Sequence, residues 1–260
     1  MLVPGGRGND PYAFVAAPCS LLTLPARRPP IAHPSPTHRP PSPARSRPPG
    51  PGRSPHPPAD GTAGSTGQNG TVTRIIAGSA GGRRLAVPAG RGTRPTSDRA
   101  REGLFATIGS LIGTFDGIRV MDLYAGSGAV GLEALSRGAA HALLVESDPK
   151  AVRAIKANVA ELGLPGAQVV ADKVERVLAT PPAEPGARYD LVFADPPYAL
   201  ADARVRETLE ALRAGWLAPE ALVVVERETR GGPLAWPDGF DPVRERRYGE
   251  ATLWYAFGPC

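Results

Sequence analysis

The strongest constraint on the fold is a regular alternation of short apolar runs and amphipathic stretches along most of the chain. Apolar runs bounded by turn residues predict buried strands, and apolar residues spaced three and four apart predict helices. Strands that alternate with helices form a parallel sheet with helices on both faces. Strands are expected at 117–123, 142–146, 168–171, 189–194 and 221–226. One helix is expected to begin at 98, and a second is expected to follow the glycine-rich turn and end near 137. Three more are expected at 149–162, 174–179 and 201–214.

Two more β-type runs close the chain, at 242–248 and 251–257. They predict an antiparallel hairpin at one edge of the sheet. The expected fold class is therefore α/β, a doubly wound, mostly parallel and Rossmann-like sheet of seven strands. Before it, the runs 73–77 and 84–87 surround several glycines and predict a short β-hairpin, which is followed by the first helix.

The composition changes sharply near residue 72. The chain has 31 prolines and a net charge of +5. More than half of the prolines and the whole net charge fall in residues 1–71, which have few apolar residues. Such a segment cannot bury enough surface to offset its ordering entropy, so we predict that 1–71 is disordered. It is a spacer, or a basic arm for nucleic acid or an SH3-like partner, and we expect the natural start near Val72.

Three parts are thus predicted: the tail 1–71, a hairpin and helix extension at 72–115, and a core at 116–260. No apolar stretch is long enough to span a membrane, and no secretory signal is recognised. Two cysteines, Cys19 and Cys260, exclude a disulfide framework and a cysteine zinc site. His141 is the single histidine after the tail, so no metal site is expected, and we predict a cytoplasmic protein.

A glycine-rich turn follows the first predicted strand of the core. Gly126, Gly128 and Gly131 match the dinucleotide fingerprint, and Glu146 stands 20 residues after Gly126, at the end of the next strand. An NAD-dependent oxidoreductase is therefore one interpretation. Asp122, at the approach to the turn, would repel a pyrophosphate but suits the ammonium and sulfonium of S-adenosylmethionine, which is the second interpretation.

The sequence Asp195-Pro196-Pro197-Tyr198 follows the fourth predicted strand, where open α/β sheets bind ligands. The prolines fix the backbone, so the Asp195 carboxylate and the Pro196 carbonyl can accept two N–H groups of one amine. Tyr198 offers a flat face on which a base can stack. Methylation of an amine is mainly a task of orientation. The tetrapeptide therefore favours an amino methyltransferase.

Arginine is concentrated between residues 74 and 101, where it is opposed by one acid, Asp98. Such a segment predicts a surface that contacts nucleic-acid phosphates. A target base would then be unstacked and turned into the pocket. A non-catalytic RNA-binding protein is the alternative from another class, but it would not need the tetrapeptide. The arginines assigned to RNA are Arg83, Arg84, Arg94, Arg99 and Arg101.

Together these motifs resemble the class I S-adenosylmethionine-dependent methyltransferases that act on exocyclic amines of nucleobases. The segments 74–78, 82–85, 94–105 and 247–249 narrow the resemblance to the bacterial 16S rRNA (guanine-966-N2) methyltransferases, over residues 72–257. The family tends to have Phe-Asn where this chain has Phe105-Ala106, which puts a role of the asparagine in doubt. An N6-adenine methyltransferase of DNA or RNA remains the runner-up, since the tetrapeptide does not distinguish the two bases.

The resemblance implies a role for each site residue. Asp122 lies near the cofactor ammonium, Glu146 holds the ribose, and Asp172 takes the adenine amino group or else caps a helix. Asp148 is expected to be a helix cap. The residues implied in cofactor binding are Asp122, Tyr124, Gly126, Ser127, Gly128, Glu146 and Asp172. The residues implied in orienting the guanine are Asp195, Pro196, Pro197 and Tyr198. The expected partner is 16S rRNA, naked or within a 30S particle.

Overall fold

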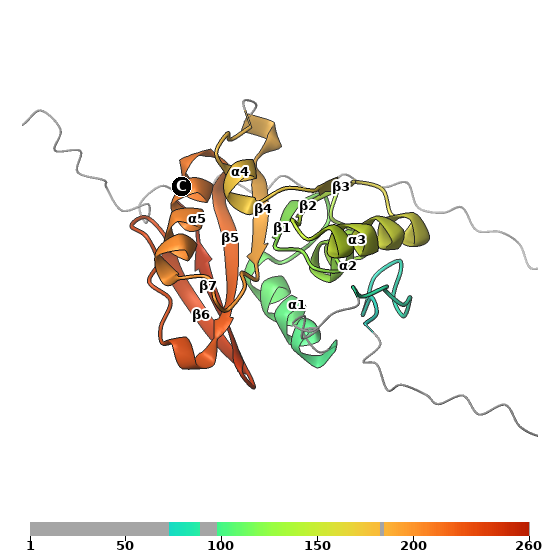
Figure 1. The fold of residues 1–260 in the computed structure, drawn as a ribbon, viewed down its shortest axis with the longest axis horizontal. Helices are drawn as coiled ribbons and strands as arrows, with labels where there is room; N and C mark the ends of the chain where they lie inside the picture. The colour runs from blue at the N-terminus through green and yellow to red at the C-terminus, as the bar shows by residue number, and fades with distance from the viewer. Residues whose placement is uncertain (1–72, 89–97, 183–184, 260) are drawn as a thin grey trace, which may run out of the picture. The chain divides into compact units, whose positions relative to one another are not determined.

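The computed structural model describes residues 73–88, 98–182 and 185–259 (Figure 1). The predicted tail and Arg94 lie outside these residues, so their predictions stay open. All described residues belong to one compact unit. Its helices are α1 (Asp98–Ile112), α2 (Ala129–Ser136), α3 (Pro149–Leu162), α4 (Val174–Leu178) and α5 (Asp202–Gly215). Its strands are β1 (Arg119–Leu123), β2 (His141–Val145), β3 (Ala167–Val170), β4 (Tyr189–Ala194), β5 (Leu217–Glu228), β6 (Asp241–Tyr248) and β7 (Ala251–Phe257).

The strands form one seven-stranded sheet in the order β3-β2-β1-β4-β5-β7-β6. The first five strands are parallel, and β7 is antiparallel to both β5 and β6. The predicted doubly wound sheet with an edge hairpin is confirmed. The strand order reverses between β1 and β4, and open α/β sheets bind ligands beyond the carboxyl ends of the strands at such a point.

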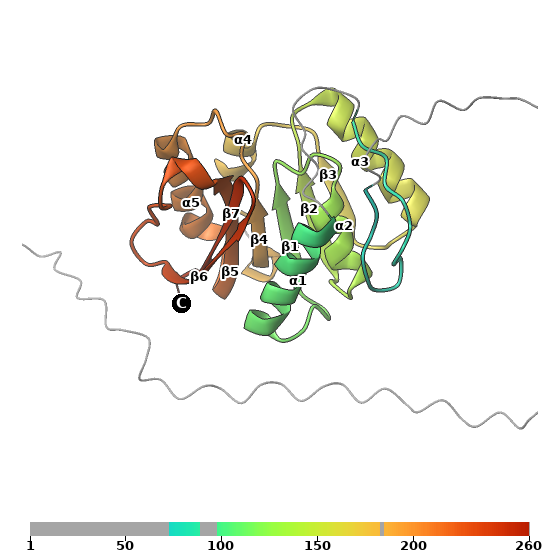
Figure 2. The ribbon, with the colours of Figure 1, turned by 90° about the horizontal axis from the view of Figure 1, so that it is seen from below.

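Helices cover both faces of the sheet (Figure 2). Side chains alternate along each strand, so Val120 of β1 packs in one core and Met121 in the other. The first core also contains residues of α1, α2 and α3, and the second contains residues of α4 and α5. Leu104, Phe105 and Ile108 of α1 are buried in the first core, on the apolar face that the sequence predicts.

The segment 73–88 differs from the predicted hairpin. It contains a single antiparallel bridge, between Arg74 and Arg84, and no strand. Its backbone forms three hydrogen bonds across its own turn, from Ile75 to Arg83, from Gly82 to Ile75 and from Leu85 to Thr73. It is also bonded to α2 and α3, which are distant in sequence, and it runs beside α3 in Figure 2. Gly78 approaches α2 so closely that an added Cβ would stand 1.9 Å from the Ser136 carbonyl oxygen. The segment therefore turns back on itself as predicted, but the two predicted strands were wrong, since the pairing does not extend beyond one bridge.

Three polar side chains fix this segment, and we call Glu133, Ser136 and Asn158 the anchor. Glu133 accepts the N–H groups of Ile76 and Ala77 at 2.6 and 3.0 Å. Ser136 accepts the N–H of Ala80 at 2.9 Å and donates to the Ala77 carbonyl at 2.6 Å. Asn158 forms hydrogen bonds with both backbone groups of Ala86. Among the described residues, no helix has the length and apolar character needed to cross a membrane.

Candidate active site

The carboxyl ends of β1, β2, β4 and β5 meet at one edge of the sheet, and this edge carries most of the predicted site residues. Asp122 of β1 is buried, and its carboxylate accepts the N–H of Gly131 at 2.9 Å. Burial raises the pKa of Asp122 to about 7; the Gly131 hydrogen bond opposes this rise, and the nearby Glu146 adds to it. Such a carboxyl is poised to ionise when a cation binds beside it.

The glycine turn leads directly from β1 into α2. Gly126 and Gly128 have φ values of 57° and 77°, which side chains rarely adopt. A Cβ at Gly128 would lie 2.9 Å from Leu144, whereas a Cβ at Gly126 would point into open space. The Ser127 carbonyl accepts a hydrogen bond from the anchor residue Asn158 at 2.9 Å. The turn is therefore held on its inner side and accessible at Gly126.

Glu146 follows β2 and touches the turn. Its carboxylate accepts the N–H of Gly126 at 2.8 Å and those of Ser147 and Asp148 at 2.6 and 2.7 Å. Asp148 caps α3 by accepting the N–H groups of Lys150 and Ala151, as predicted. The structure thus brings Gly126 and Glu146 together at the carboxyl ends of the strands, where a ligand is expected.

Asp172 lies just after β3, on the far side of β2 from the glycine turn. Its carboxylate accepts the N–H of Lys173 at 2.7 Å and pairs with Arg176 at 3.4 Å. The helix α4 begins after Lys173 and has no side-chain cap. Asp172 is therefore not the cap that the sequence left as an alternative, and its contact with adenine stays a prediction.

The tetrapeptide follows β4, as predicted. The Asp195 N–H donates to the Leu123 carbonyl at 3.3 Å, which places the catalytic candidate beside the end of β1. Pro196 is buried, whereas Tyr198 is 44% exposed. Within the described residues, no N–H or O–H group donates to the Pro196 carbonyl. This carbonyl can therefore accept a substrate N–H.

Three carboxylates stand in a row on the α1 face of adjacent strands: Asp122 of β1, Asp195 after β4 and Glu226 of β5. Burial raises the pKa of Asp195 well above its ordinary value, and Glu226 and Asp122 raise it further, while Arg227 lowers it. Sequence reasoning missed Glu226, although an acid that ends the apolar run 221–225 was a usable signal. In the part of the chain that the structure describes, no cluster of three or more His, Cys, Asp or Glu side chains has the arrangement of a metal site.

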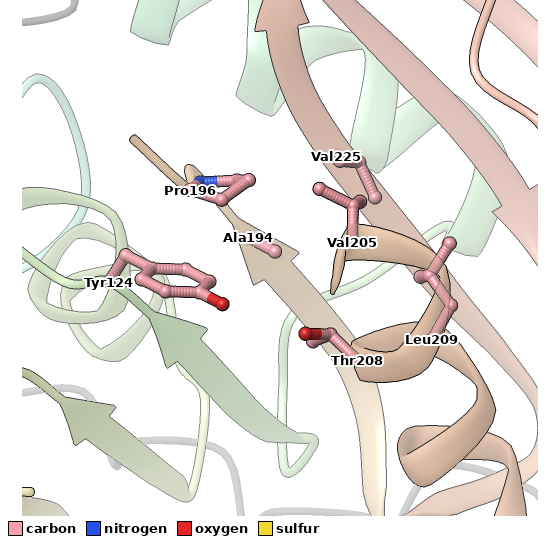
Figure 3. A pocket seen from close by; sticks show the side chains of 7 residues that line it. All are labelled: Tyr124, Ala194, Pro196, Val205, Thr208, Leu209 and Val225. Carbon is pink, nitrogen blue, oxygen red and sulfur yellow. The ribbon is translucent and has the colours of Figure 1, made fainter. Parts of the chain in front are cut away.

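A small pocket lies beside Pro196 on the α5 face of the sheet (Figure 3). The Tyr124 hydroxyl points toward the Thr208 side chain there, and burial raises the pKa of Tyr124. Tyr124 has a φ of 58°, and its ring packs in the second core. The structure thus places Tyr124 against the tetrapeptide and on the opposite face from Asp122. The pocket is lined by Tyr124, Ala194, Pro196, Val205, Thr208, Leu209 and Val225.

The arginines predicted to contact RNA differ in burial and in the groups they contact. Arg101 is 1% exposed and donates to Asp98 at 2.6 Å and to the Arg74 carbonyl at 2.7 Å. The prediction that Arg101 contacts phosphates was therefore wrong, because its guanidinium is inside the protein. Arg83 donates to the carbonyls of Glu161 and Leu162 at the end of α3. Arg84 and Arg99 are exposed, so their RNA contacts stay predictions.

Comparison with known proteins decides the family. Residues 73–257 match the family model described as conserved hypothetical protein 95. The chain belongs to this family. The ribosomal RNA small subunit methyltransferase D of Escherichia coli K12 is 40% identical over 180 residues, which are 69% of this chain and 86% of that protein. The methyltransferase D of Haemophilus influenzae Rd is 35% identical over 180 residues, 68% of this chain and 89% of that protein.

Solved structures agree with the family assignment. The protein yhhF of Escherichia coli superposes with a TM-score of 0.62 at 37% identity and covers 73% of this chain and 99% of its own. The Thermus thermophilus protein TTHA0928 has a TM-score of 0.58 at 39% identity and covers 72% of this chain and 99% of its own. The resemblance to small-subunit rRNA methyltransferases that the sequence predicted is confirmed.

Proposed function

We propose that this protein transfers a methyl group from S-adenosylmethionine to the exocyclic N2 amine of a guanine in 16S rRNA. The observation that carries the proposal is the position of Asp195-Pro196-Pro197-Tyr198 after β4, beside the end of β1 and the glycine turn, whose Gly126 N–H donates to Glu146. The relatives named ribosomal RNA small subunit methyltransferase D support the substrate class. We place the reaction in the cytoplasm, where ribosomal subunits are made.

The residues at the ligand edge fit S-adenosylmethionine. The pKa values of Asp122 and of the partly buried Asp195 are raised by desolvation and by acidic neighbours that repel their charged forms. A ligand with a sulfonium and an ammonium would relieve this repulsion, whereas the two phosphates of NAD would add to it. Asp122 would hold the ammonium, the open side of Gly126 would receive the methionine part, and Glu146 would hold the ribose. The bound cofactor supplies an electrophilic methyl group.

The protein residues orient the amine that attacks this methyl group. The guanine N2 lone pair is delocalised into the ring, so the amine must be turned until the lone pair is in line with the methyl. The Asp195 carboxylate and the Pro196 carbonyl would each accept one N2–H, and Tyr198 would stack on the base. The methylated amine loses a proton, and Asp195 is suited to accept it because its pKa is raised.

The proposal is tested by the product and by the substrate form. Purified protein and S-adenosylmethionine are incubated with 30S subunits from a strain lacking this activity, with naked 16S rRNA and with duplex DNA. Nucleoside mass spectrometry should find N2-methylguanosine in rRNA, and the comparison of 30S with naked rRNA identifies the natural form of the substrate. If the product were N6-methyladenosine, the target base would be adenine and not guanine, and the proposal would be wrong on that point. No transfer to any of the three substrates would refute the proposal.

A further inference from the structure

The loop between β4 and α5 carries Tyr198 and is held by one side chain from a different strand. Arg227 lies near the end of β5, and its side chain is 12% exposed. It donates to the Leu200 carbonyl at 2.9 Å and, more weakly, to the Pro197 carbonyl at 3.4 Å. It also donates to the Asp202 carboxylate at 2.9 Å. Sequence reasoning gave Arg227 no role.

These three contacts surround Tyr198. Pro197 precedes Tyr198, Leu200 follows it by two residues, and Asp202 is the first residue of α5. Within the loop, the Leu200 N–H donates to the Pro197 carbonyl at 2.8 Å and closes a turn. Arg227 therefore binds the carbonyl groups at both ends of this turn. Tyr198 itself is 44% exposed at the crest of that turn and lines a groove together with Arg227.

The chemistry of arginine suits this task. The guanidinium is charged at every relevant pH and presents several N–H donors in a fixed plane, so it can bond two carbonyls and a carboxylate at once. A lysine would keep the charge but has no planar fork. The contact with the Leu200 carbonyl is partly buried and therefore less screened by water than the ion pair with Asp202, whose side chain is 76% exposed.

We propose that Arg227 is a positioning residue for the target base: it fixes the turn 197–200 so that Tyr198 stands where the base stacks. This inference rests on the proposed function of the tetrapeptide. Arg227 acts through Tyr198 and does not itself touch the reacting amine. A second consequence follows from its charge, because Arg227 also favours the ionised form of Asp195, which Glu226 and Asp122 disfavour.

The test compares Arg227→Met, Arg227→Lys and a matched control, Arg206→Met. Arg206 is an exposed arginine of α5 whose partner is Glu210, away from the turn. For Arg227→Met we expect a KM for the RNA substrate raised roughly tenfold and a kcat lowered roughly tenfold, with cofactor affinity kept. The acid limb of its kcat profile should move to higher pH, since Asp195 loses the charge that favours its ionised form.

Arg227→Lys separates the two effects. It should keep the pH profile of the wild type because the charge remains, but it should keep a raised KM because one ammonium cannot replace the fork. Hydrogen exchange at 198–201 gives a readout that needs no substrate: it should be faster in both variants and unchanged in Arg206→Met. If Arg227→Met does not fold, Asp202→Ala releases one contact and should raise KM by roughly twofold to threefold.

The outcomes distinguish this inference from the function on which it rests. Wild-type protein without methyl transfer to 30S subunits or rRNA would refute the proposed function, whatever the variants do. Active wild type together with a folded Arg227→Met that keeps the wild-type KM, kcat, pH profile and loop exchange would refute the positioning role. A loss of stability alone, with unchanged kinetics of the folded fraction, would equally refute it.

Discussion

Glu133 in α2 and Asp122 in β1 are both buried carboxylates, but their surroundings differ. Glu133 accepts two backbone N–H groups of the segment 73–88 and pairs with Arg137 at 2.7 Å. Asp122 accepts one backbone N–H, which lowers its pKa, but burial and the nearby Glu146 raise the pKa to about 7. Removing one partner of a buried charge that is paired within the chain destabilises the fold, because the other partner is left buried alone. A buried acid that lacks a cation destabilises the ligand-free fold and favours a cationic ligand.

The largest expected effect is on the anchor. Glu133→Ala should lower the free energy of unfolding by about 3–5 kcal/mol, because it leaves two backbone donors and Arg137 without their buried partner. Urea denaturation of wild type and variant measures this difference. Glu161→Ala is the control, since Glu161 is exposed and its ion pair with Arg83 should contribute less than about 1 kcal/mol. Equal losses in both variants would contradict the anchor.

Asp122→Asn should raise the free energy of unfolding of the ligand-free protein, in contrast to Glu133→Ala. In the unfolded chain the pKa of this residue is near 3.8, and in the folded protein it is about 7. Folding therefore favours the protonated form, and the stability of the ligand-free protein falls as pH rises between these values. The substitution removes this loss, so it should stabilise the ligand-free protein by about 2–4 kcal/mol above pH 7 and hardly at all below pH 4.

The same Asp122→Asn variant should bind S-adenosylmethionine more weakly, as calorimetry can show. Stability that stays below that of the wild type at high pH would contradict a raised pKa. Unchanged cofactor affinity would show that Asp122 does not bind the ammonium of the cofactor.

Arg101→Met should destabilise the protein by a smaller amount, about 1–3 kcal/mol. The substitution removes the contacts to Asp98 and to the Arg74 carbonyl. It also removes Nε and Nη1, which are buried without a hydrogen-bond partner in the described residues, and this offsets part of the loss. Thermal denaturation measures the effect. RNA affinity of the folded variant should be unchanged, and a flatter salt dependence would place Arg101 at the RNA surface after all.

The smallest expected effect concerns Arg83, whose contacts are with α3. Arg83→Ala should lower the free energy of unfolding by less than about 1 kcal/mol and leave the salt dependence of RNA binding as it is. The exposed pair Arg84→Ala and Arg99→Ala should instead flatten the plot of log affinity against log salt by roughly 0.7–0.9 for each lost phosphate contact. The reverse result would show that the salt-bridged arginine is the one that meets RNA.

Local patterns predicted most of the fold. The helix 149–162 and the strands 189–194 and 251–257 agree with the structure at both ends, because Asp148, Gly163 and the apolar runs mark their limits in the sequence. The positions of the candidate site residues at the carboxyl ends of β1, β2 and β4 could be predicted for the same reason, since they follow from where these strands end. No local pattern predicts the anchor, whose residues lie more than 50 positions from the backbone groups of 73–88 that they bind.

The remaining errors come from long-range contacts too. The segment 73–88 has the composition of a hairpin and pairs with itself at one bridge, but α2 and α3 bind the rest of its backbone, which sequence alone does not reveal. Counting charges placed Arg101 at a surface, although its burial depends on how α1 packs against 73–77. Glu226 and Arg227 gain their importance only from register, which sets β5 beside β4 and brings Val225 opposite Ala194.

The central claim is that the residues after β4 carry out the transfer, and Asp195→Ala tests it most directly. The measurement is the single-turnover rate of N2-methylguanosine formation in 30S subunits, with the exposed Asp238→Ala as the matched control and cofactor binding measured in parallel. The account predicts a rate lower by roughly two orders of magnitude or more for Asp195→Ala, with cofactor affinity largely kept and Asp238→Ala unaffected. A wild-type rate in Asp195→Ala would contradict it.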